Sequence, residues 1–227
     1  MTSERQVVFL FDVDDTLLDN DTAQVDYLDH ITKNFGALAA QRYWAIFQEL
    51  FNELGYADYL GALQRYRLEN LHDPRLLMMS CFLLDYPFED RLYPRALEVL
   101  KHLQRFGPTV ILSDGDVVFQ PRKIQRSGIR DAVEGRVLIY VHKEIELSDV
   151  ERFYPADRYV LVDDKLRILA AVKQIWGGRV TTVQPRQGHY ANDPKAHAAY
   201  PPADITIDRI GDLLNYDMAA LVALKSA

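Results

Sequence analysis

Five short runs of β-prone apolar residues alternate along the chain with helical segments, and this alternation limits the fold more than any other feature. The runs cover residues 7–11, 109–112, 137–141, 159–162 and 180–183. Helical patterning covers residues 96–106, 117–126, 144–153, 166–176 and 209–225. A strand, a helix and a further strand in succession favour right-handed crossovers between parallel strands. The sequence therefore predicts an α/β fold with a mostly parallel sheet.

The long interval between the first and second runs has a different pattern. From Asp21 to about Asp85, apolar residues recur at helical spacing, and no strand-like alternation appears. A chain of 227 residues accommodates one domain that carries such an insertion. We expect a core formed by residues 1–20 and 93–227, with an inserted helical segment at residues 21–92. Residues 184–204, which contain four prolines, are expected to form an irregular loop.

The composition narrows the class of protein. The chain has 33 acidic and 26 basic residues, a formal net charge of −7, which argues against a general binder of nucleic acid or anionic membranes. No apolar run approaches the ~18 residues of a membrane span, and none matches a signal peptide. We expect a soluble, cytoplasmic protein. The single cysteine, Cys81, excludes an intramolecular disulfide, and its apolar neighbours predict a packed thiol.

Polar and charged residues follow four of the predicted strands. In chain order they are Asp12 and Asp14, Ser113 and Asp114, Lys143, and Asp163 and Asp164. Any one of them alone could cap a helix or lie in a solvated loop. However, ligands of an open parallel sheet bind beyond the carboxyl ends of its strands, and here all four groups fall at such ends. The joint pattern predicts a site at this edge of the sheet.

The carboxylates in this group require a cation. Two carboxylates ~4 Å apart repel each other by about 4 kcal/mol at an effective dielectric near 20. Oxygen ligands without His or Cys select a hard ion, and Mg²⁺ is the natural candidate. Mg²⁺ often shares its ligand shell with phosphate, which indicates a phosphorylated substrate. Lys143 could neutralise a carboxylate and a phosphate oxygen, and Ser113 could donate to an anion.

These residues resemble the motifs of the haloacid dehalogenase (HAD) superfamily. Residues 11–17, Phe-Asp-Val-Asp-Asp-Thr-Leu, are similar to its first motif, in which an aspartate, any residue, a second aspartate, any residue and a threonine follow an apolar run. Residues 111–113 resemble the second motif, Lys143 the third, and residues 160–164 the fourth. The resemblance implies a Rossmann-like three-layer core and Mg²⁺-dependent phosphoryl transfer through an aspartyl-phosphate. It also implies that residues 21–92 form the helical cap that many members carry between the first two motifs.

The resemblance assigns a role to each residue. Asp12 would be the nucleophile and a metal ligand. Asp14 would protonate the leaving oxygen and later deprotonate water, while its backbone carbonyl reaches the metal. Ser113, Asp114 and Lys143 would form the phosphate-binding group. Asp163 and Asp164 would complete the metal shell, and the sequence leaves open which of them binds the ion directly.

Two departures from the family pattern bear on these roles. Many members have glycine where this chain has Asp163, and many have Thr-Asn where it has Ser113 and Asp114.

We expect a phosphatase that acts on a small phosphorylated metabolite, of undefined oligomeric state. A haloacid dehalogenase is disfavoured because halide leaves without protonation, which would make Asp14 unnecessary. A phosphomutase shares every core residue, and a catalytically silent binding protein on this fold is the alternative from another class.

Overall fold

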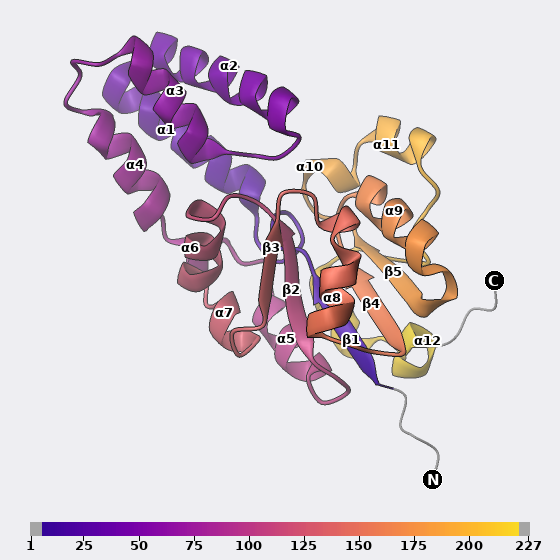
Figure 1. Cartoon of the computed structure of the whole chain (residues 1–227). Coiled ribbons are helices and arrows are strands. Elements are labelled where there is room, and N and C mark those ends of the chain that lie inside the picture. The colour runs from indigo at the N-terminus through magenta and orange to yellow at the C-terminus, as the bar shows by residue number, and fades with distance from the viewer. Residues whose placement is uncertain (1–5, 223–227) are drawn as a thin grey trace.

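In the computed structural model, which describes residues 6–222, a six-stranded sheet runs through the core (Figure 1). Its strands are β1 (Val7–Phe11), β2 (Thr109–Asp114), β3 (Val137–Tyr140), β4 (Arg158–Val162), β5 (Val180–Pro185) and β6 (Ile205–Ile207). They lie in the order β3-β2-β1-β4-β5-β6, and every neighbouring pair is parallel. The predicted parallel α/β sheet is confirmed. The strand order reverses between β1 and β4.

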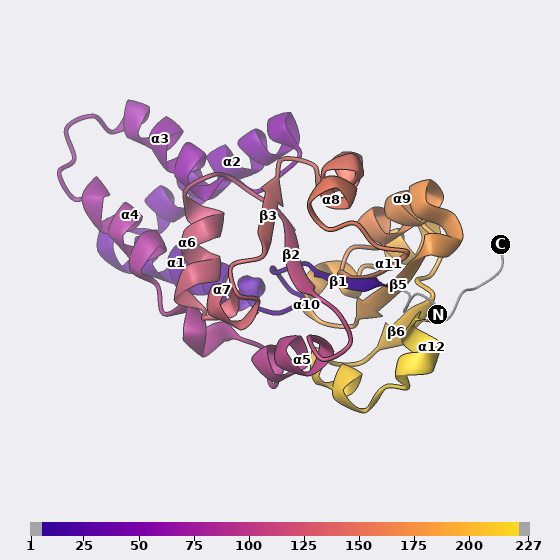
Figure 2. The same cartoon turned by 60° about the horizontal axis from the view of Figure 1, so that its bottom comes forward.

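Helices cover both faces of the sheet, and the side chains of β1 alternate between them. Phe9 and Phe11 join the cluster of α5 (Ala96–Leu103), α7 (Ile129–Ala132), η4 (Ile210–Asn215) and α12 (Met218–Val222). Val8 and Leu10 join the cluster of α8 (Leu147–Phe153) and α9 (Leu166–Trp176). This division follows from the two-residue period of a strand that is buried on both faces. The result is the expected three-layer arrangement, visible from a second side in Figure 2.

The helices between β1 and α5 lie to one side of the sheet (Figure 1). They are α1 (Asn20–Phe35), α2 (Ala37–Leu54), α3 (Tyr59–Glu69), α4 (Leu76–Asp85) and η1 (Phe88–Arg91). Aromatic rings hold these helices together, with Tyr27 against Tyr43 at 5.2 Å and Phe47 against Tyr59 at 4.6 Å between centroids. We refer to residues 20–91 as the helical insertion.

Local sequence signals set the ends of the helices in the insertion. The side chain of Asp19 accepts a hydrogen bond from the backbone N–H of Thr22 at 2.9 Å, which caps the start of α1. Gly55 ends α2 in the left-handed conformation, with φ of 78°, which glycine adopts without the steric cost of a Cβ atom. Because the cap of α1 is Asp19, the insertion begins close to the motif that follows β1.

Four details differ from the sequence prediction. Strand β6 was not expected, since three residues are too few to show a periodicity. The expected irregular loop contains α10 (Gly188–Ala191) and α11 (Pro194–Ala199). The expected helix at residues 209–225 is divided into η4 and α12 because Tyr216 is extended, and residues 223–225 lie outside the described part. Cys81 is exposed, since α4 turns Met79 and Leu83 inward and leaves Cys81 on its other face.

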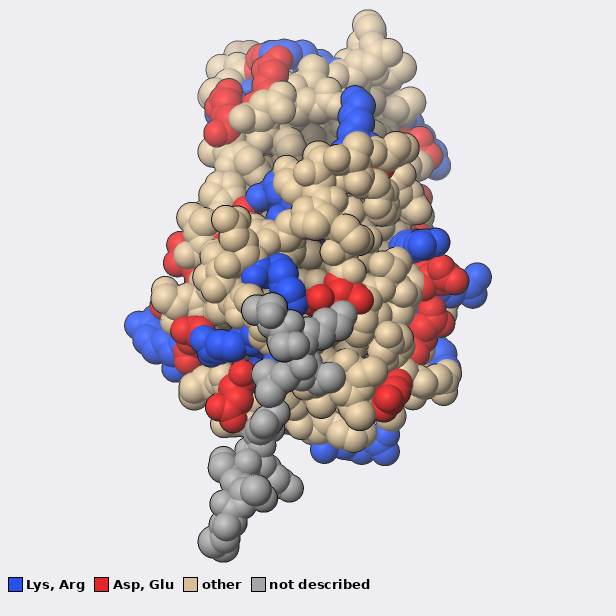
Figure 3. All heavy atoms as spheres, turned by 90° about the vertical axis from the view of Figure 1, so that its right-hand side faces the viewer, with Lys and Arg blue, Asp and Glu red and all other residues tan. Residues whose placement is uncertain are grey.

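The surface reflects the mixed charge of the sequence. On the face drawn in Figure 3, Lys and Arg side chains lie intermixed with Asp and Glu side chains. Within residues 6–222, no helix combines the length and the apolar character needed to cross a membrane.

Candidate active site

The carboxyl edge of the sheet brings together residues from the first four strands. Asp12 directly follows β1, Ser113 lies at the end of β2, Lys143 follows β3, and Asp163 and Asp164 directly follow β4. All five side chains are buried. Because the strand order reverses between β1 and β4, the site lies where open α/β sheets bind their ligands.

Lys143 links two of the buried carboxylates. Its Nζ lies 2.5 Å from Oδ1 of Asp12 and 2.6 Å from Oδ2 of Asp163, and it also donates to the main-chain carbonyl of Leu112 at 3.2 Å. Burial alone would lower the pKa of Lys143, but the carboxylates of Asp12 and Asp163 raise it well above its ordinary value. Lys143 is therefore a fixed cation between the ends of β1 and β4.

Asp12, Asp163 and Asp164 form an acidic cluster, in which one oxygen of each carboxylate lies within 4.8 Å of the others. Oδ2 of Asp12 and both carboxylate oxygens of Asp164 have no hydrogen-bond partner among the described residues. Burial raises the pKa of Asp164 well above its ordinary value, an effect that Lys165 opposes and that Asp163 and Asp12 reinforce. An unpartnered buried carboxylate is unfavourable unless a cation neutralises it. The donor set therefore fits a hard divalent cation such as Mg²⁺.

Asp14 is separate from this acidic cluster. Its Oδ1 accepts a hydrogen bond from Nζ of Lys123 at 2.7 Å, and its Oδ2 accepts one from Nε2 of Gln120 at 3.3 Å. Asp12 and Asp14 are two residues apart, yet each carboxylate is paired with a different lysine. This separation permits the two aspartates to have different chemical roles.

Ser113 and Asp114 contact two different groups at the end of β2. The Ser113 hydroxyl oxygen accepts a hydrogen bond from Nε2 of Gln120 at 2.9 Å. Oδ1 of Asp114 accepts the backbone N–H of Lys143 at 2.7 Å, so this carboxylate holds the loop that carries the lysine. Burial raises the pKa of Asp114, although the Lys143 ammonium opposes the shift.

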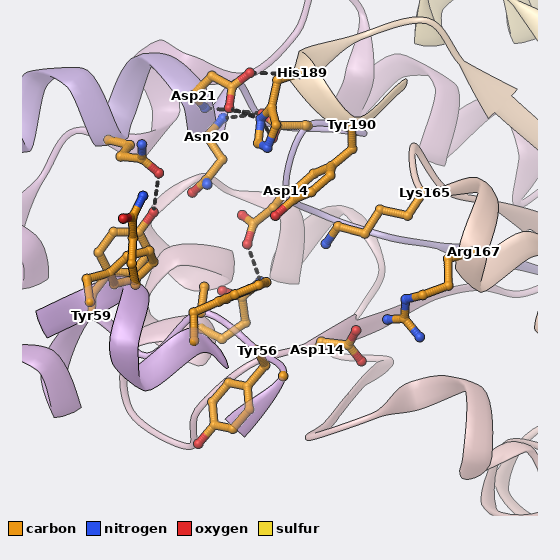
Figure 4. A pocket seen from close by; sticks show the side chains of 18 of the residues that line it. Asp14, Asn20, Asp21, Tyr56, Tyr59, Asp114, Lys165, Arg167, His189 and Tyr190 are labelled. Atoms are coloured by element: carbon orange, nitrogen blue, oxygen red, sulfur yellow. Dashed lines mark hydrogen bonds and ion pairs between the residues drawn. The ribbon is translucent and has the colours of Figure 1, made fainter. Parts of the chain in front are cut away.

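A pocket of about 1320 Å³ lies between the sheet edge and the helical insertion (Figure 4). Asp14, Asp114 and Lys165 contribute to it from the core, whereas Asp12 and Lys143 are buried and do not line it. The Lys165 ammonium lies 4.9 Å from the centroid of the Tyr190 ring. The wall from the insertion is mixed in character, and its aromatic residues are Trp44, Phe47, Phe51, Tyr56 and Tyr59.

A second group of side chains joins the core to the start of the insertion. His189 of α10 places Nδ1 2.5 Å from Oδ1 of Asp21, and its backbone N–H donates to Oδ2 of the same residue at 2.9 Å. The hydrogen bond that His189 donates to the Asp21 carboxylate raises the pKa of His189. Asp15 accepts the backbone N–H groups of Asn20 and Asp21 at 3.0 and 3.2 Å. These contacts fix α10 beside the first turn of α1.

Several side chains of the site were not predicted from the sequence. Lys165 lies in the pocket and directly follows the acidic pair, which is a usable signal. Gln120 and Lys123 contact Asp14 from α6 (Phe119–Arg126). They are three residues apart and so share one face of the helix, but only the fold shows that this face meets Asp14.

The fold and the site define an α/β enzyme of the class that builds its active centre from acidic residues and a lysine at the ends of parallel strands. A family model described as haloacid dehalogenase-like hydrolase matches residues 7–175. The chain therefore belongs to the haloacid dehalogenase-like hydrolases, as its motifs predict.

Solved structures agree with this family. The chain is similar to a haloacid dehalogenase-like hydrolase from Burkholderia xenovorans LB400, with 65% identity, a TM-score of 0.90, and coverage of 94% of this chain and 99% of that one. L-2-haloacid dehalogenase from Xanthobacter autotrophicus has 17% identity and a TM-score of 0.63, over 92% of this chain and 96% of that one. The HAD-hydrolase YfnB from Bacillus subtilis has 18% identity and a TM-score of 0.63, over 93% and 98%. The last two share the fold. A search of curated proteins finds no match.

Proposed function

We propose that the protein is a Mg²⁺-dependent phosphatase that hydrolyses a small phosphorylated metabolite through an aspartyl-phosphate intermediate. The observation that carries this proposal is that the carboxylates of Asp12 and Asp14 have different surroundings. Asp12 belongs to the buried acidic cluster and has an oxygen without a hydrogen-bond partner within residues 6–222. Asp14 lines the pocket with its own pair of donors. A carboxylate nucleophile and a separate acid–base carboxylate are what hydrolysis of a phosphate ester requires.

In the first half of the reaction, an oxygen of Asp12 forms a bond to phosphorus while the bond to the leaving oxygen breaks. Asp14 donates a proton to that leaving oxygen. Lys143 and Ser113 bind the phosphoryl oxygens, and Asp114 holds the loop of Lys143 in place. In the second half, water attacks phosphorus, Asp14 accepts its proton, and inorganic phosphate leaves with Asp12 restored.

Asp12, Asp163 and Asp164 are the residues that would hold Mg²⁺, together with the backbone carbonyl of Asp14. The bound ion would neutralise these carboxylates and reduce the charge that the nucleophile meets on the phosphate. The structure of YfnB, which has the same fold, is described as bound to magnesium, which supports a role for this ion. The pocket-facing Lys165 would balance the remaining negative charge.

We further propose that the helical insertion acts as a cap over the site. Its side chains line the pocket, while Asp12 is only 2% exposed, so a phosphate reaches this carboxylate only after some movement. The YfnB structure is described as revealing interdomain movement, which supports such a motion in this fold. Closure of a cap would also exclude bulk water during transfer.

The alternative function is that of the haloacid dehalogenases whose fold the chain shares. Halide departs without a proton and the reaction needs no metal, so a dehalogenase would leave the roles of Asp14 and the acidic cluster unexplained. A phosphomutase would use the same residues and return the phosphoryl group to a second substrate instead of water.

A direct assay separates these functions. Purified protein is incubated with para-nitrophenyl phosphate and with a panel of sugar, alkyl and nucleoside phosphates, with and without Mg²⁺, and separately with 2-chloropropionate. We expect release of inorganic phosphate that depends on Mg²⁺, and no release of chloride. Chloride release without phosphate release would refute the proposal, and the Asp12→Asn variant is the blank for both reactions.

A further inference from the structure

Lys123 is a lysine with almost no solvent contact. Its side chain is 1% exposed and lies near the rings of Phe88 and Phe119, whose centroids are 5.9 and 5.1 Å from Nζ. The ammonium has two oxygen acceptors, Oδ1 of Asp14 at 2.7 Å and Oδ1 of Asn20 at 2.9 Å. Lysine is rarely buried so completely unless it is paired, because removing its charge from water is costly. The pairing with Asp14 therefore accounts for its position.

Gln120 completes the contacts of Asp14 from the same face of α6. Its side chain is 3% exposed, and its Nε2 lies 3.3 Å from Oδ2 of Asp14 and 2.9 Å from Oγ of Ser113. Each carboxylate oxygen of Asp14 thus has its own donor, Lys123 for one and Gln120 for the other. Two donors on one rigid helix fix both the position and the rotation of a carboxylate.

The second acceptor of Lys123 connects this arrangement to the helical insertion. Asn20 is the first residue of α1, and its backbone N–H donates to Oδ1 of Asp15 at 3.0 Å. Lys123 therefore binds both to the first motif, at Asp14, and to the start of the insertion, at Asn20. The position of Asp14 is thereby coupled to the first turn of the proposed cap.

We propose that Lys123 is a positioning residue that orients the carboxylate of Asp14 for proton transfer to the leaving oxygen. The inference rests on the phosphatase function proposed above. Lys123 itself transfers no proton, and it acts through the geometry of Asp14. Because proton transfer requires the carboxylate within hydrogen-bond reach of the leaving oxygen, loss of its orientation should affect the steps that need a proton.

The test compares two substrates that differ only in how much their leaving group needs a proton. Para-nitrophenyl phosphate releases a stabilised phenolate, whereas phenyl phosphate releases a more basic one. In Lys123→Met we expect kcat for phenyl phosphate to fall by on the order of 10²-fold, with a tenfold or smaller fall, roughly, for para-nitrophenyl phosphate and little change in KM. Introducing Lys123→Met into Asp14→Asn should cause no further loss on phenyl phosphate, because the group it positions is already absent.

Matched variants exclude a general structural effect. Lys173 of α9 is also paired with an aspartate, since its Nζ lies 2.7 Å from Oδ2 of Asp204, but it does not line the pocket. Lys173→Met should therefore leave both activities unchanged. Lys123→Gln, which keeps a hydrogen-bond donor, should recover part of the activity on phenyl phosphate. It also supplies the substrate comparison if Lys123→Met does not fold, as judged by thermal unfolding.

Equal losses on the two esters, or an additive loss in the Asp14→Asn background, would overturn the positioning role. A wild-type protein without phosphatase activity would instead refute the proposed function, and with it the basis of this inference.

Discussion

Lys143 and Asp12 are 131 residues apart in the chain, yet they form a buried ion pair with 2.5 Å between Nζ and Oδ1. The other oxygen of Asp12 has no hydrogen-bond partner in the part of the chain that the structure describes. Lys143 thus neutralises and holds one oxygen, while the lone pairs of the other oxygen are not used in a hydrogen bond with the described residues. This asymmetry suits a carboxylate that attacks phosphorus, and it motivates the first two predictions.

Replacing Asp12 by Asn should abolish turnover of every phosphate ester, because no carboxylate remains to accept the phosphoryl group. The fold should survive, since the amide is nearly isosteric with the carboxylate and relieves charge in the acidic cluster. Steady-state phosphate release and thermal unfolding together check this prediction. Residual turnover well above the rate without enzyme would show that another group is the nucleophile.

Replacing Lys143 by Met should destabilise the protein by about 3–5 kcal/mol at neutral pH without added metal, because Asp12 and Asp163 would be left buried and uncompensated. Urea unfolding measures this loss. The partly exposed pair of Lys173 with Asp204 is the matched control, and Lys173→Met should cost only about 1 kcal/mol. If the two variants lose the same stability, the buried ion pair has no special importance for the fold.

Metal removal gives the third prediction. The acidic cluster of Asp12, Asp163 and Asp164 should make activity depend on Mg²⁺, and Mg²⁺ at about 100 times its dissociation constant should stabilise metal-free protein by ~2.7 kcal/mol. Ca²⁺ should bind but support poor turnover, because its larger and looser shell misplaces the attacking carboxylate. Thermal unfolding with each ion, and in Asp164→Asn as the comparison, tests this. Full activity after exhaustive chelation would refute a role for the metal.

The sequence predicts the acidic centre well because one topological rule locates it. Once β1 and β4 are parallel neighbours, the residues that follow them, Asp12 and Asp163, must meet at one edge of the sheet. The same rule brings Lys143 to that edge from β3. No knowledge of side-chain packing is needed for these positions.

The remaining contacts depend on how helices are rotated and docked, which local patterns do not encode. Lys123 and Asp14 are 109 residues apart, and their contact requires one particular face of α6 to meet the loop after β1. The exposure of Cys81 depends in the same way on which face of α4 packs inward, because α4 is apolar at every position except Ser80 and Asp85. The three residues of β6 form a strand only because the edge of β5 is available for pairing.

The fourth prediction concerns pH and the ion pair that joins the first and last elements of the helical insertion, α1 and η1. Asp26 of α1 accepts hydrogen bonds from the hydroxyl of Tyr86 and from the guanidinium of Arg91, the latter at 2.8 Å. The hydrogen bond from Tyr86 lowers the pKa of Asp26, and the contact with Arg91 lowers it further. A lowered folded-state pKa contributes stability above the ordinary value of 3.8, and this contribution is lost as pH falls through the folded-state pKa. Asp26→Asn should therefore cost about 1 kcal/mol at pH 7, since the group is partly exposed, and the deficit should shrink below pH 3.8.

Urea unfolding of wild type and Asp26→Asn across this pH range measures the effect. Asp29, an exposed aspartate of the same helix, is the control, and Asp29→Asn should leave the stability unchanged at every pH. A deficit of Asp26→Asn that stays constant down to pH 2 would mean that the ionised carboxylate is not its source.

The last prediction separates the roles of Asp14 and Asp12. Asp14→Asn keeps the backbone carbonyl and the shape of the side chain, but it cannot donate or accept the proton. General acid–base assistance is typically worth 10²–10⁴-fold, so phenyl phosphate and alkyl phosphates should lose about that much in kcat. Para-nitrophenyl phosphate scarcely needs a protonated leaving group, so formation of its aspartyl-phosphate should be less impaired. Hydrolysis of the intermediate should slow for all of these esters, because Asp14 also activates the water.

These unequal effects should make the intermediate accumulate. Rapid quench with ³²P-labelled para-nitrophenyl phosphate should trap label on the protein in Asp14→Asn, and none in Asp12→Asn, which lacks the accepting carboxylate. The double variant should resemble Asp12→Asn, because no aspartyl-phosphate forms without the accepting carboxylate. Equal loss on activated and unactivated esters without trapped label would make Asp14 a structural or metal-shell residue. The hydrogen bonds from Lys123 and Gln120 would then serve only to hold the loop after β1 against α6.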